Sequence, residues 1–334
     1  MRPGKTQYPY LILVNSLVPA LLAGNSVILK PSPQTPTVAE QVAAAFTLAG
    51  LPEGVLQYFH SGSPTTIETM VRDWRIAHVC FTGSVAGGLA VQRAAADRIV
   101  GVGLELGGKD PAYVRDDVDV GWAAEEIVDG AVFNSGQSCC AIERVYVHEA
   151  IHDSFIDEVK RVLRGYKLGD PFDKSTHLGP VISERSKATI EAHVKDACQK
   201  GARDETPENE TFDVLPTKGN FVKATLLMGV NHSMTVMTEE TFGPVIPVMK
   251  VSGDAEAVKL MNDSEFGLTA SIWTKNTARG HELADEVDAG TVFVNRCDFP
   301  SPVSRKCAVG LMTRNTNAAA RISHGLDGGI PGGV

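Results

Sequence analysis

The sequence predicts an α/β fold, with a doubly wound parallel sheet in the first part of the chain and a second α/β domain after it. Two observations support this prediction. Short apolar runs of strand length alternate with helical stretches from residue 10 onward, which is typical of parallel strands joined by crossover helices. The length of 334 residues, 43% of them hydrophobic, is also sufficient for two domains with buried cores.

Composition and charge exclude several classes of protein. The formal net charge of −9, without a run of basic residues, argues against a nucleic-acid-binding surface. The six cysteines form no C-x-x-C pair, so we expect neither a zinc site nor a disulfide framework. No metal site is predicted, and free thiols are expected in a reducing, cytoplasmic compartment.

The apolar stretch near the N-terminus could be mistaken for a signal peptide or a membrane span. Asn15, Pro19 and Gly24 interrupt it before it reaches the roughly 20 apolar residues that a span requires. We therefore expect a buried helix followed by a buried strand, and no association with a membrane.

The elements of the first part are predicted from apolar runs bounded by glycine and proline. In chain order they are a helix over 10–22, a strand over 26–30, a helix with Pro36 as its first residue that ends at Gly50, a strand over 55–59, a helix after Pro64, a strand over 77–81, a helix over 85–96 and a strand over 102–106.

The second part continues the same alternation less regularly. Its predicted elements are a helix over 122–133, a strand over 144–148, a helix over 151–164, strands over 245–251 and 291–294, and polar loops over 168–180 and 202–219. Residues from 298 onward are rich in glycine and lack periodicity, which predicts a poorly ordered tail.

A first candidate site is Phe81-Thr82-Gly83-Ser84, between a predicted strand and a predicted helix. Glycines at such a turn let backbone amides approach a phosphate at the helix N-terminus, and Gly87 and Gly88 fit this pattern too. The spacing is not G-x-G-x-x-G, so a purely structural turn is an equally good interpretation.

Two further features carry reactive side chains. Glu105 is a single carboxylate between leucines at a strand end, where burial would raise its pKa and suit it to act as a general base. A salt bridge is the alternative interpretation. Cys139 follows a glycine-containing loop and is a candidate nucleophile, although either Cys139 or Cys140 alone could be a buried structural thiol.

Together these motifs resemble the aldehyde dehydrogenase superfamily in their order and intervals, over about residues 8–297. The matching segments are Lys30-Pro31-Ser32, Phe81-Thr82-Gly83-Ser84, the L-E-L-G-G-K block at 104–109, G-Q-x-C at 136–139, Glu239-Glu240-Thr241-Phe242-Gly243-Pro244, Asn262 through Phe266-Gly267-Leu268, and Asn295. The resemblance implies a partial NAD(P)-binding domain over 1–107 and a catalytic thiol domain over 108–297, followed by the tail over 298–334.

The implied reaction is the oxidation of a small aldehyde to a carboxylic acid with NAD or NADP. Cys139 would attack the aldehyde to give a thiohemiacetal and then a thioester, and Glu105 would activate the water that hydrolyses it. Gln7 occupies the position of a family asparagine that contributes to the oxyanion hole. Its amide has a longer arm, so the contact could be misplaced.

The resemblance also implies the cofactor contacts. Lys30 matches the lysine that holds the adenosine ribose, Glu240 the acid that holds the nicotinamide ribose, and Phe242 the aromatic residue beside the nicotinamide. The full implied set is Lys30, Ser32, Gly83, Ser84, Gly88, Leu106, Gly107, Glu240 and Phe242.

Two departures from the family pattern leave alternatives open. Pro33 stands where many NAD-preferring members have glutamate, which leaves the choice between NAD and NADP undecided. The segments before Tyr8 and after Phe299 do not match, so we expect a chain shortened at both ends, without the segments through which the family forms homo-oligomers. The alternatives are a weak or inactive homologue, or a CoA-acylating or phosphorylating dehydrogenase, against which Glu105 argues.

Overall fold

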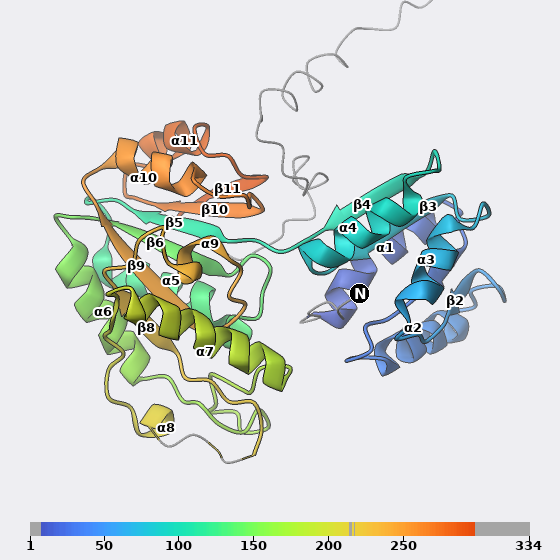
Figure 1. The fold of residues 1–334 in the computed structure, drawn as a ribbon, viewed down its shortest axis with the longest axis horizontal. Helices are drawn as coiled ribbons and strands as arrows, with labels where there is room; N and C mark the ends of the chain where they lie inside the picture. Colours follow the sequence, from blue (N-terminus) through green and yellow to red (C-terminus); the bar gives the residue numbers. More distant parts are fainter. Residues whose placement is uncertain (1–7, 214–215, 217, 298–334) are drawn as a thin grey trace, which may run out of the picture.

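The computed structural model describes residues 8–213, 216 and 218–297 in two lobes (Figure 1). The first lobe ends with strand β4 and the second begins with strand β5, and a short connection joins them. Gln7 and the predicted tail over 298–334 lie outside the described residues. No helix in the described part of the chain is long and apolar enough to cross a membrane.

The first lobe contains the predicted alternation of helices and strands. Its elements are α1 (Pro9–Leu22), β1 (Val27–Leu29), α2 (Thr37–Leu48), β2 (Leu56–Tyr58), α3 (Pro64–Arg72), β3 (His78–Thr82), α4 (Val85–Ala95) and β4 (Gly101–Glu105). β1 pairs with β2 and β3 with β4, both in parallel, and no ladder joins the two pairs within the described residues. Each pair is connected through a helix, as parallel strands require.

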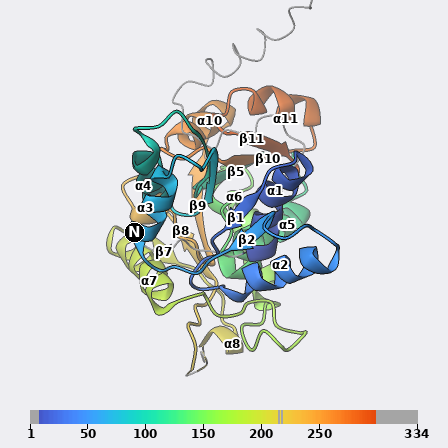
Figure 2. The same cartoon turned by 90° about the vertical axis from the view of Figure 1, so that its right-hand side faces the viewer.

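Two details of this lobe differ from the sequence prediction. Pro36 is the N-cap of α2, not its first helical residue. The prediction of a buried first helix followed by a buried strand was wrong. Tyr10, Leu11 and Leu22 are exposed and only Leu17 of α1 is buried, and in β1 Ile28 is 46% exposed. Leu17 packs into a small cluster with two valines of α2, and Leu13 and Leu21 lie partly buried against that cluster. Figure 2 shows α1 beside α2 and β1.

The second lobe is built on one mixed sheet of seven strands. Its elements are β5 (Asp110–Val114), α5 (Val120–Val132), the 3₁₀ turn η1 (Phe133–Gly136), β6 (Ile142–His148), α6 (His152–Arg164), α7 (Glu184–Gln199), β7 (Arg203–Asp204), α8 (Glu210–Asp213), β8 (Thr225–Met228), α9 (Thr235–Thr238), β9 (Val245–Val251), α10 (Asp254–Asn262), β10 (Thr269–Trp273), α11 (Thr277–Ala284) and β11 (Thr291–Val294). The strand order is β11-β10-β5-β6-β9-β8-β7, and every neighbouring pair is parallel except β7 with β8.

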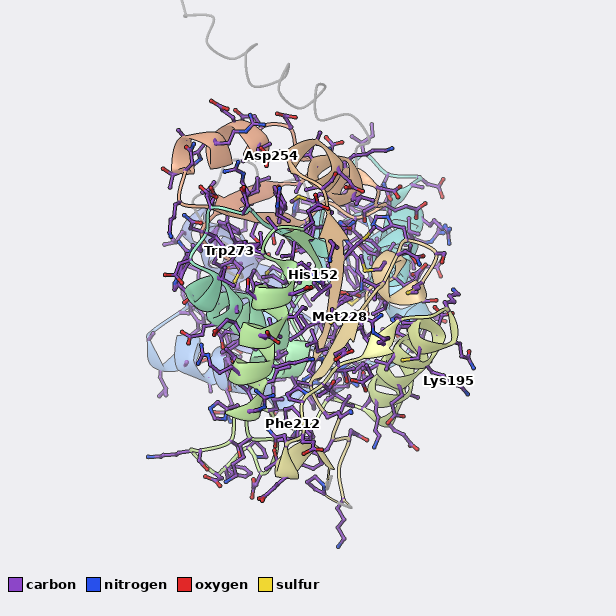
Figure 3. The ribbon with its side chains drawn as sticks, turned by 90° about the vertical axis from the view of Figure 1, so that its left-hand side faces the viewer. His152, Lys195, Phe212, Met228, Asp254 and Trp273 are labelled. Carbon is purple, nitrogen blue, oxygen red and sulfur yellow. The ribbon has the colours of Figure 1, made fainter. Side chains whose placement is uncertain are left out.

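Both faces of this sheet are buried, as parallel strands require. Along β6, Val145 and Val147 join the core beneath α5 and α6, whereas Tyr146 between them joins the core on the opposite face. Figure 3 shows how side chains fill this lobe: Trp273 and Met228 are buried, whereas Lys195 projects from the surface of α7. The lobe is therefore a rigid support for loops at the strand ends.

The second lobe also holds elements that the sequence analysis did not predict. The predicted strands over 245–251 and 291–294 are confirmed as β9 and β11. β5 was missed because it begins with Asp110 and Pro111, residue types that are depleted in strands. α7 was missed because polar residues dominate it, and its buried side chains include only Ile190 among the large apolar types.

Replacing Phe155 of α6 with alanine should lower the free energy of unfolding by about 3–5 kcal/mol, because the side chain is fully buried in the core under the sheet. Urea denaturation followed by fluorescence measures this. Phe172→Ala is the matched control in the same lobe, since that ring is exposed and its loss should change stability by no more than about 0.5 kcal/mol. Equal losses in the two variants would contradict the described packing.

Candidate active site

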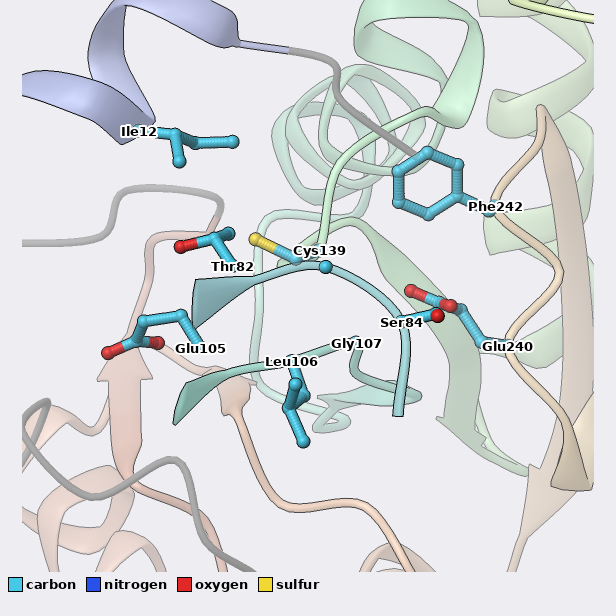
Figure 4. A pocket seen from close by; sticks show the side chains of 10 residues that line it. Ile12, Thr82, Ser84, Glu105, Leu106, Gly107, Cys139, Glu240 and Phe242 are labelled. Atoms are coloured by element: carbon cyan, nitrogen blue, oxygen red, sulfur yellow. The ribbon is translucent and has the colours of Figure 1, made fainter. Parts of the chain in front are cut away.

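A pocket forms where loops of the two lobes meet (Figure 4). The residues that line it come from α1, from the ends of β3 and β4, from the loop before β6 and from the loop before β9: Ile12, Thr82, Gly83, Ser84, Glu105, Leu106, Gly107, Cys139, Glu240 and Phe242. Nine of these residues, all except Ile12, belong to motifs that were singled out from the sequence. Of the remaining candidates, Lys30, Ser32 and Gly88 do not line the pocket, and Gln7 is not described.

The ends of β3 and β4 are placed side by side by the register of their pairing. Thr82 is paired with Glu105 at the last position of both strands, and the Gly83 amide donates to the Glu105 carbonyl at 2.9 Å. Ser84 is the N-cap of α4, where its hydroxyl accepts from the Gly87 amide at 3.3 Å. The positive end of the α4 dipole therefore faces the pocket region, which suits an anionic group.

Two glycines of α4 have a packing role in the structure. A Cβ at Gly88 would lie 2.6 Å from Leu106 Cδ2, and one at Gly87 would lie 2.7 Å from the Phe81 ring. Both glycines thus let the helix approach β3 and β4 closely. Gly88 is buried and does not line the pocket. It acts through Leu106, which packs against α4 at this glycine.

Glu105 is the last residue of β4, and its side chain lines the pocket (Figure 4). It is solvent-accessible, yet the protein around it removes enough water to raise its pKa above the ordinary value for glutamate. No ion pair of Glu105 occurs within the part of the chain that the structure describes, so nothing there supports the salt-bridge interpretation. A carboxylate with a raised pKa can accept a proton near neutral pH.

The loop that carries Cys139 is held in an unusual conformation. Asn134, Ser135 and Gly136 all have positive φ, at 51°, 58° and 69°. Two contacts fix this turn: the Ser135 hydroxyl donates to the Gly179 carbonyl at 2.8 Å, and the Gln137 side-chain oxygen accepts from the Ile182 amide at 2.8 Å. Non-glycine residues in the left-handed region are costly, and they persist where surrounding contacts enforce them.

The two adjacent cysteines differ in access. Cys139 is half-buried and lines the pocket, whereas Cys140 is only 3% exposed and packs below it. Their sulfur atoms are 3.8 Å apart. Only Cys139 can therefore meet a molecule in the pocket, which supports the sequence-based assignment of the nucleophile.

The segment 240–242 forms the wall opposite the β4 end. Glu240 lies against Gly107, where a Cβ would be 2.6 Å from the Glu240 carboxyl carbon. Phe242 is only 3% exposed and has a φ of 54°, so a bulky residue is kept in the left-handed region. A side chain at Gly107 would therefore require the Glu240 carboxyl group to move from its present position.

Sequence reasoning missed several residues that shape this site. Lys109 and Glu143 form a buried ion pair, with Nζ of Lys109 2.6 Å from Oε2 of Glu143, directly behind the 240–242 segment. The signal was a charged pair, Glu143-Arg144, in an otherwise apolar strand. Ile12 was missed because it belongs to an apolar helix in which no residue stands out.

Lys30 and Ser32, which follow β1, do not line the pocket. Lys30 is half-buried, and desolvation lowers its pKa. The Ser32 hydroxyl accepts from the Gln34 amide at 3.3 Å. No group of three His, Cys, Asp or Glu side chains that could hold a metal ion occurs among residues 8–213 and 218–297.

Comparison with known proteins gives matches over most of the chain. A model of the aldehyde dehydrogenase family matches residues 7–307. Lactaldehyde dehydrogenase from Escherichia coli K12 is 36% identical over 295 residues, which is 87% of this chain and 60% of that protein.

Solved structures agree with this match. An NADP-dependent glyceraldehyde-3-phosphate dehydrogenase from Bacillus halodurans C-125, complexed with NADP, has a TM-score of 0.79 at 36% identity over 86% of this chain and 58% of that one. An aldehyde dehydrogenase from Mycobacterium tuberculosis, complexed with NAD+, has a TM-score of 0.82 at 33% identity over 88% and 60%. The chain therefore spans about three fifths of the length of these relatives.

Replacing Gly136 with alanine should destabilise the fold and displace the Cys139 loop, because a Cβ would overlap the Gly243 carbonyl and lie 2.7 Å from the Pro244 nitrogen. We expect the free energy of unfolding to fall by about 1–3 kcal/mol more than the left-handed φ alone would cost an alanine. Gly229→Ala is the matched control in urea denaturation, since Gly229 has a φ of 71° and nothing within 4 Å of its Cβ position. A loss no larger than that of the control would show that the loop does not press on Gly243.

Proposed function

This chain belongs to the aldehyde dehydrogenase family, and we propose that it oxidises a small aldehyde to a carboxylic acid with NAD or NADP. One observation carries the proposal: the half-buried thiol of Cys139, from one lobe, and the carboxyl group of Glu105, from the other, line the same pocket. These are the nucleophile and the base that such an oxidation needs.

In the first step, the Cys139 sulfur adds to the carbonyl carbon of the aldehyde and forms a thiohemiacetal. A thiol suits this role because it is both a soft nucleophile and a good leaving group. Its loop is fixed by the contacts of Ser135 and Gln137, so the sulfur is positioned before substrate arrives. Gln7, which is not described, is proposed to donate its side-chain amide to the developing oxyanion.

The residues around the pocket fit a nicotinamide dinucleotide. Ser84 and the start of α4 would present backbone amides to the pyrophosphate, Glu240 would accept hydrogen bonds from a ribose, and Phe242 would support the nicotinamide ring. Gly107 leaves the backbone open there, since a side chain would fill the space beside Glu240. When bound, the nicotinamide would accept the hydride that converts the thiohemiacetal to a thioester.

Lys30 and Ser32 are proposed to hold the adenosine end of the cofactor, on the strength of the family motif and their position after β1. Pro33 between them and the next helix is exposed and carries no charge. Pro33 would therefore neither repel nor attract the 2′-phosphate of NADP. We propose that the protein accepts both NAD and NADP.

Glu105 completes the reaction by taking a proton from water. The water attacks the thioester carbon, the bond to sulfur breaks, and the carboxylic acid leaves with Cys139 regenerated. The raised pKa of Glu105 makes it a stronger base than an ordinary glutamate.

We also propose the organisation of the chain: residues 1–107 bind the cofactor, and residues 108–297 carry the thiol. A cytoplasmic location is proposed because all five described cysteines are free thiols. Incubating the protein with an aldehyde series and either cofactor, while following the absorbance of the reduced nicotinamide, tests the activity. No reduction with any aldehyde would favour an inactive homologue.

Replacing Cys139 with alanine should abolish aldehyde oxidation, whereas Cys140→Ala should keep at least a third of it. The reason is access: only Cys139 lines the pocket. Steady-state rates and peptide mass spectrometry after iodoacetamide labelling measure the two effects. Labelling of Cys140 before Cys139 in the wild-type protein would contradict the assignment.

Replacing Glu105 with glutamine should lower steady-state turnover by about 10²–10⁴-fold, because the base for thioester hydrolysis is lost. The first burst of reduced nicotinamide should survive, since it precedes hydrolysis. In the wild-type protein, turnover should fall as pH drops through the raised pKa of Glu105, because the protonated carboxyl cannot accept a proton.

Stopped-flow absorbance over a range of pH measures both effects, with Glu53→Gln, an exposed glutamate of the first lobe, as the control. If Glu105→Gln removes the burst while cofactor binding is normal, Glu105 acts at an earlier step than hydrolysis.

A further inference from the structure

We propose that the buried side chains of Glu143 and Lys109 form a clamp that positions Glu240 and Phe242 and thereby sets the affinity of the pocket for the nicotinamide dinucleotide. The proposal rests on the proposed function and deepens it. It assigns a positioning role to two residues that do not line the pocket themselves.

The clamp holds the segment 240–242 by direct hydrogen bonds. Oε2 of Glu143 accepts from the Thr241 amide at 2.7 Å, and Oε1 accepts from the Phe242 amide at 2.8 Å. Nζ of Lys109 donates to Oε2 of Glu143 at 2.6 Å and to the Thr241 hydroxyl at 3.0 Å. One carboxylate therefore binds two successive backbone amides and a buried cation.

Burial makes these bonds strong and their loss costly. Lys109 is 1% exposed, Glu143 4% and Thr241 2%. Charged groups that are fully removed from water need partners, and hydrogen bonds to an ionised carboxylate are about twice as strong as neutral ones. Burial lowers the pKa of Lys109, and the charge of Glu143 opposes that shift.

The segment that the clamp holds does not adopt its conformation without help. Phe242 has a φ of 54°, a region that bulky residues avoid. The bond from the Phe242 amide to Glu143 fixes the peptide immediately before that residue. Without it, relaxation of Phe242 toward ordinary φ would swing the ring out of its buried site and move Glu240, two residues earlier, away from Gly107.

The clamp also links the two walls of the pocket. Lys109 follows Gly107 by two residues, and Glu143 follows Cys139 by four at the start of β6. Fixing Lys109 against Thr241 therefore holds the Gly107 backbone against Glu240, where contact is close. Since the groups it positions are those proposed to hold the cofactor, cofactor affinity should depend on the clamp more than thiol reactivity does.

The test compares Glu143→Gln with Glu149→Gln. Glutamine keeps the shape of Glu143 but removes the charge and one of the acceptor oxygens. Glu149 is the matched control, an exposed glutamate directly after the same strand. Dissociation constants for NAD and NADP are measured by titration calorimetry, and the rate of Cys139 alkylation by iodoacetamide is measured without cofactor.

We expect Glu143→Gln to weaken dinucleotide binding at least tenfold and to raise the KM for the cofactor, with the rate of Cys139 alkylation and kcat at saturating cofactor within threefold of wild type. Thr241→Val provides a milder variant, since it leaves the Glu143 carboxylate in place. It removes the Thr241 hydroxyl, which accepts from Lys109 and is also hydrogen-bonded to Nδ1 of His193 at 3.1 Å, and it should weaken binding about threefold. Glu149→Gln should bind like wild type.

Unchanged dinucleotide binding in a folded Glu143→Gln protein and in Thr241→Val would overturn the clamp. Equal losses of binding and of thiol reactivity would also overturn it, because they indicate general structural damage. Failure of the wild-type protein to bind either dinucleotide would instead refute the proposed function, and the clamp's role in it. The two failures are therefore distinguishable.

Discussion

The Glu143 carboxylate is the point where the segments of the pocket are tied together. It accepts from Lys109, which continues the β4 end, and from the amides of Thr241 and Phe242, which form the opposite wall. Arg144, the next residue, points to the other face of β6 and donates to the Lys109 carbonyl at 2.8 Å and to the Met261 carbonyl at 3.0 Å. Two adjacent charged residues of one strand thus hold Lys109 by its side chain and by its backbone.

Glycines complete this arrangement by allowing close approach of neighbouring side chains at Gly107 and Gly88 and of neighbouring backbone at Gly136. Gly107 meets Glu240, Gly136 meets Gly243, and Gly88 meets Leu106, and in each case a Cβ would collide with the neighbour. The sheet of the second lobe supplies the rigid base, and the paired ends of β3 and β4 supply the other wall. The thiol and the carboxyl group then reach one pocket from different lobes.

Much of this could be predicted from the sequence, for physical reasons that differ between the parts. The helices and strands of the first lobe follow from apolar runs broken by glycine and proline, and the family is confirmed by the match over residues 7–307. Cys139 and Glu105 could be found because motifs of local sequence mark them, and the structure brings both to the pocket.

The remainder depends on contacts that sequence patterns do not encode. Glu143 contacts Lys109, which is 34 residues away in the sequence, and Thr241, which is 98 residues away. No local sequence pattern predicts either contact. The exposure of α1 was mispredicted because an apolar composition does not reveal how many partners a helix finds. β5 was missed because its first two residues, Asp110 and Pro111, are poor strand formers that tertiary packing accommodates.

The central claim is that one pocket between the lobes holds both the dinucleotide and the reactive thiol. A crystal structure of the protein with NAD or NADP bound tests this most directly. The account predicts density for the nicotinamide between Cys139 and the 240–242 segment, with the pyrophosphate at the start of α4. A dinucleotide bound at any other place, with the pocket beside Cys139 left to solvent, would contradict it.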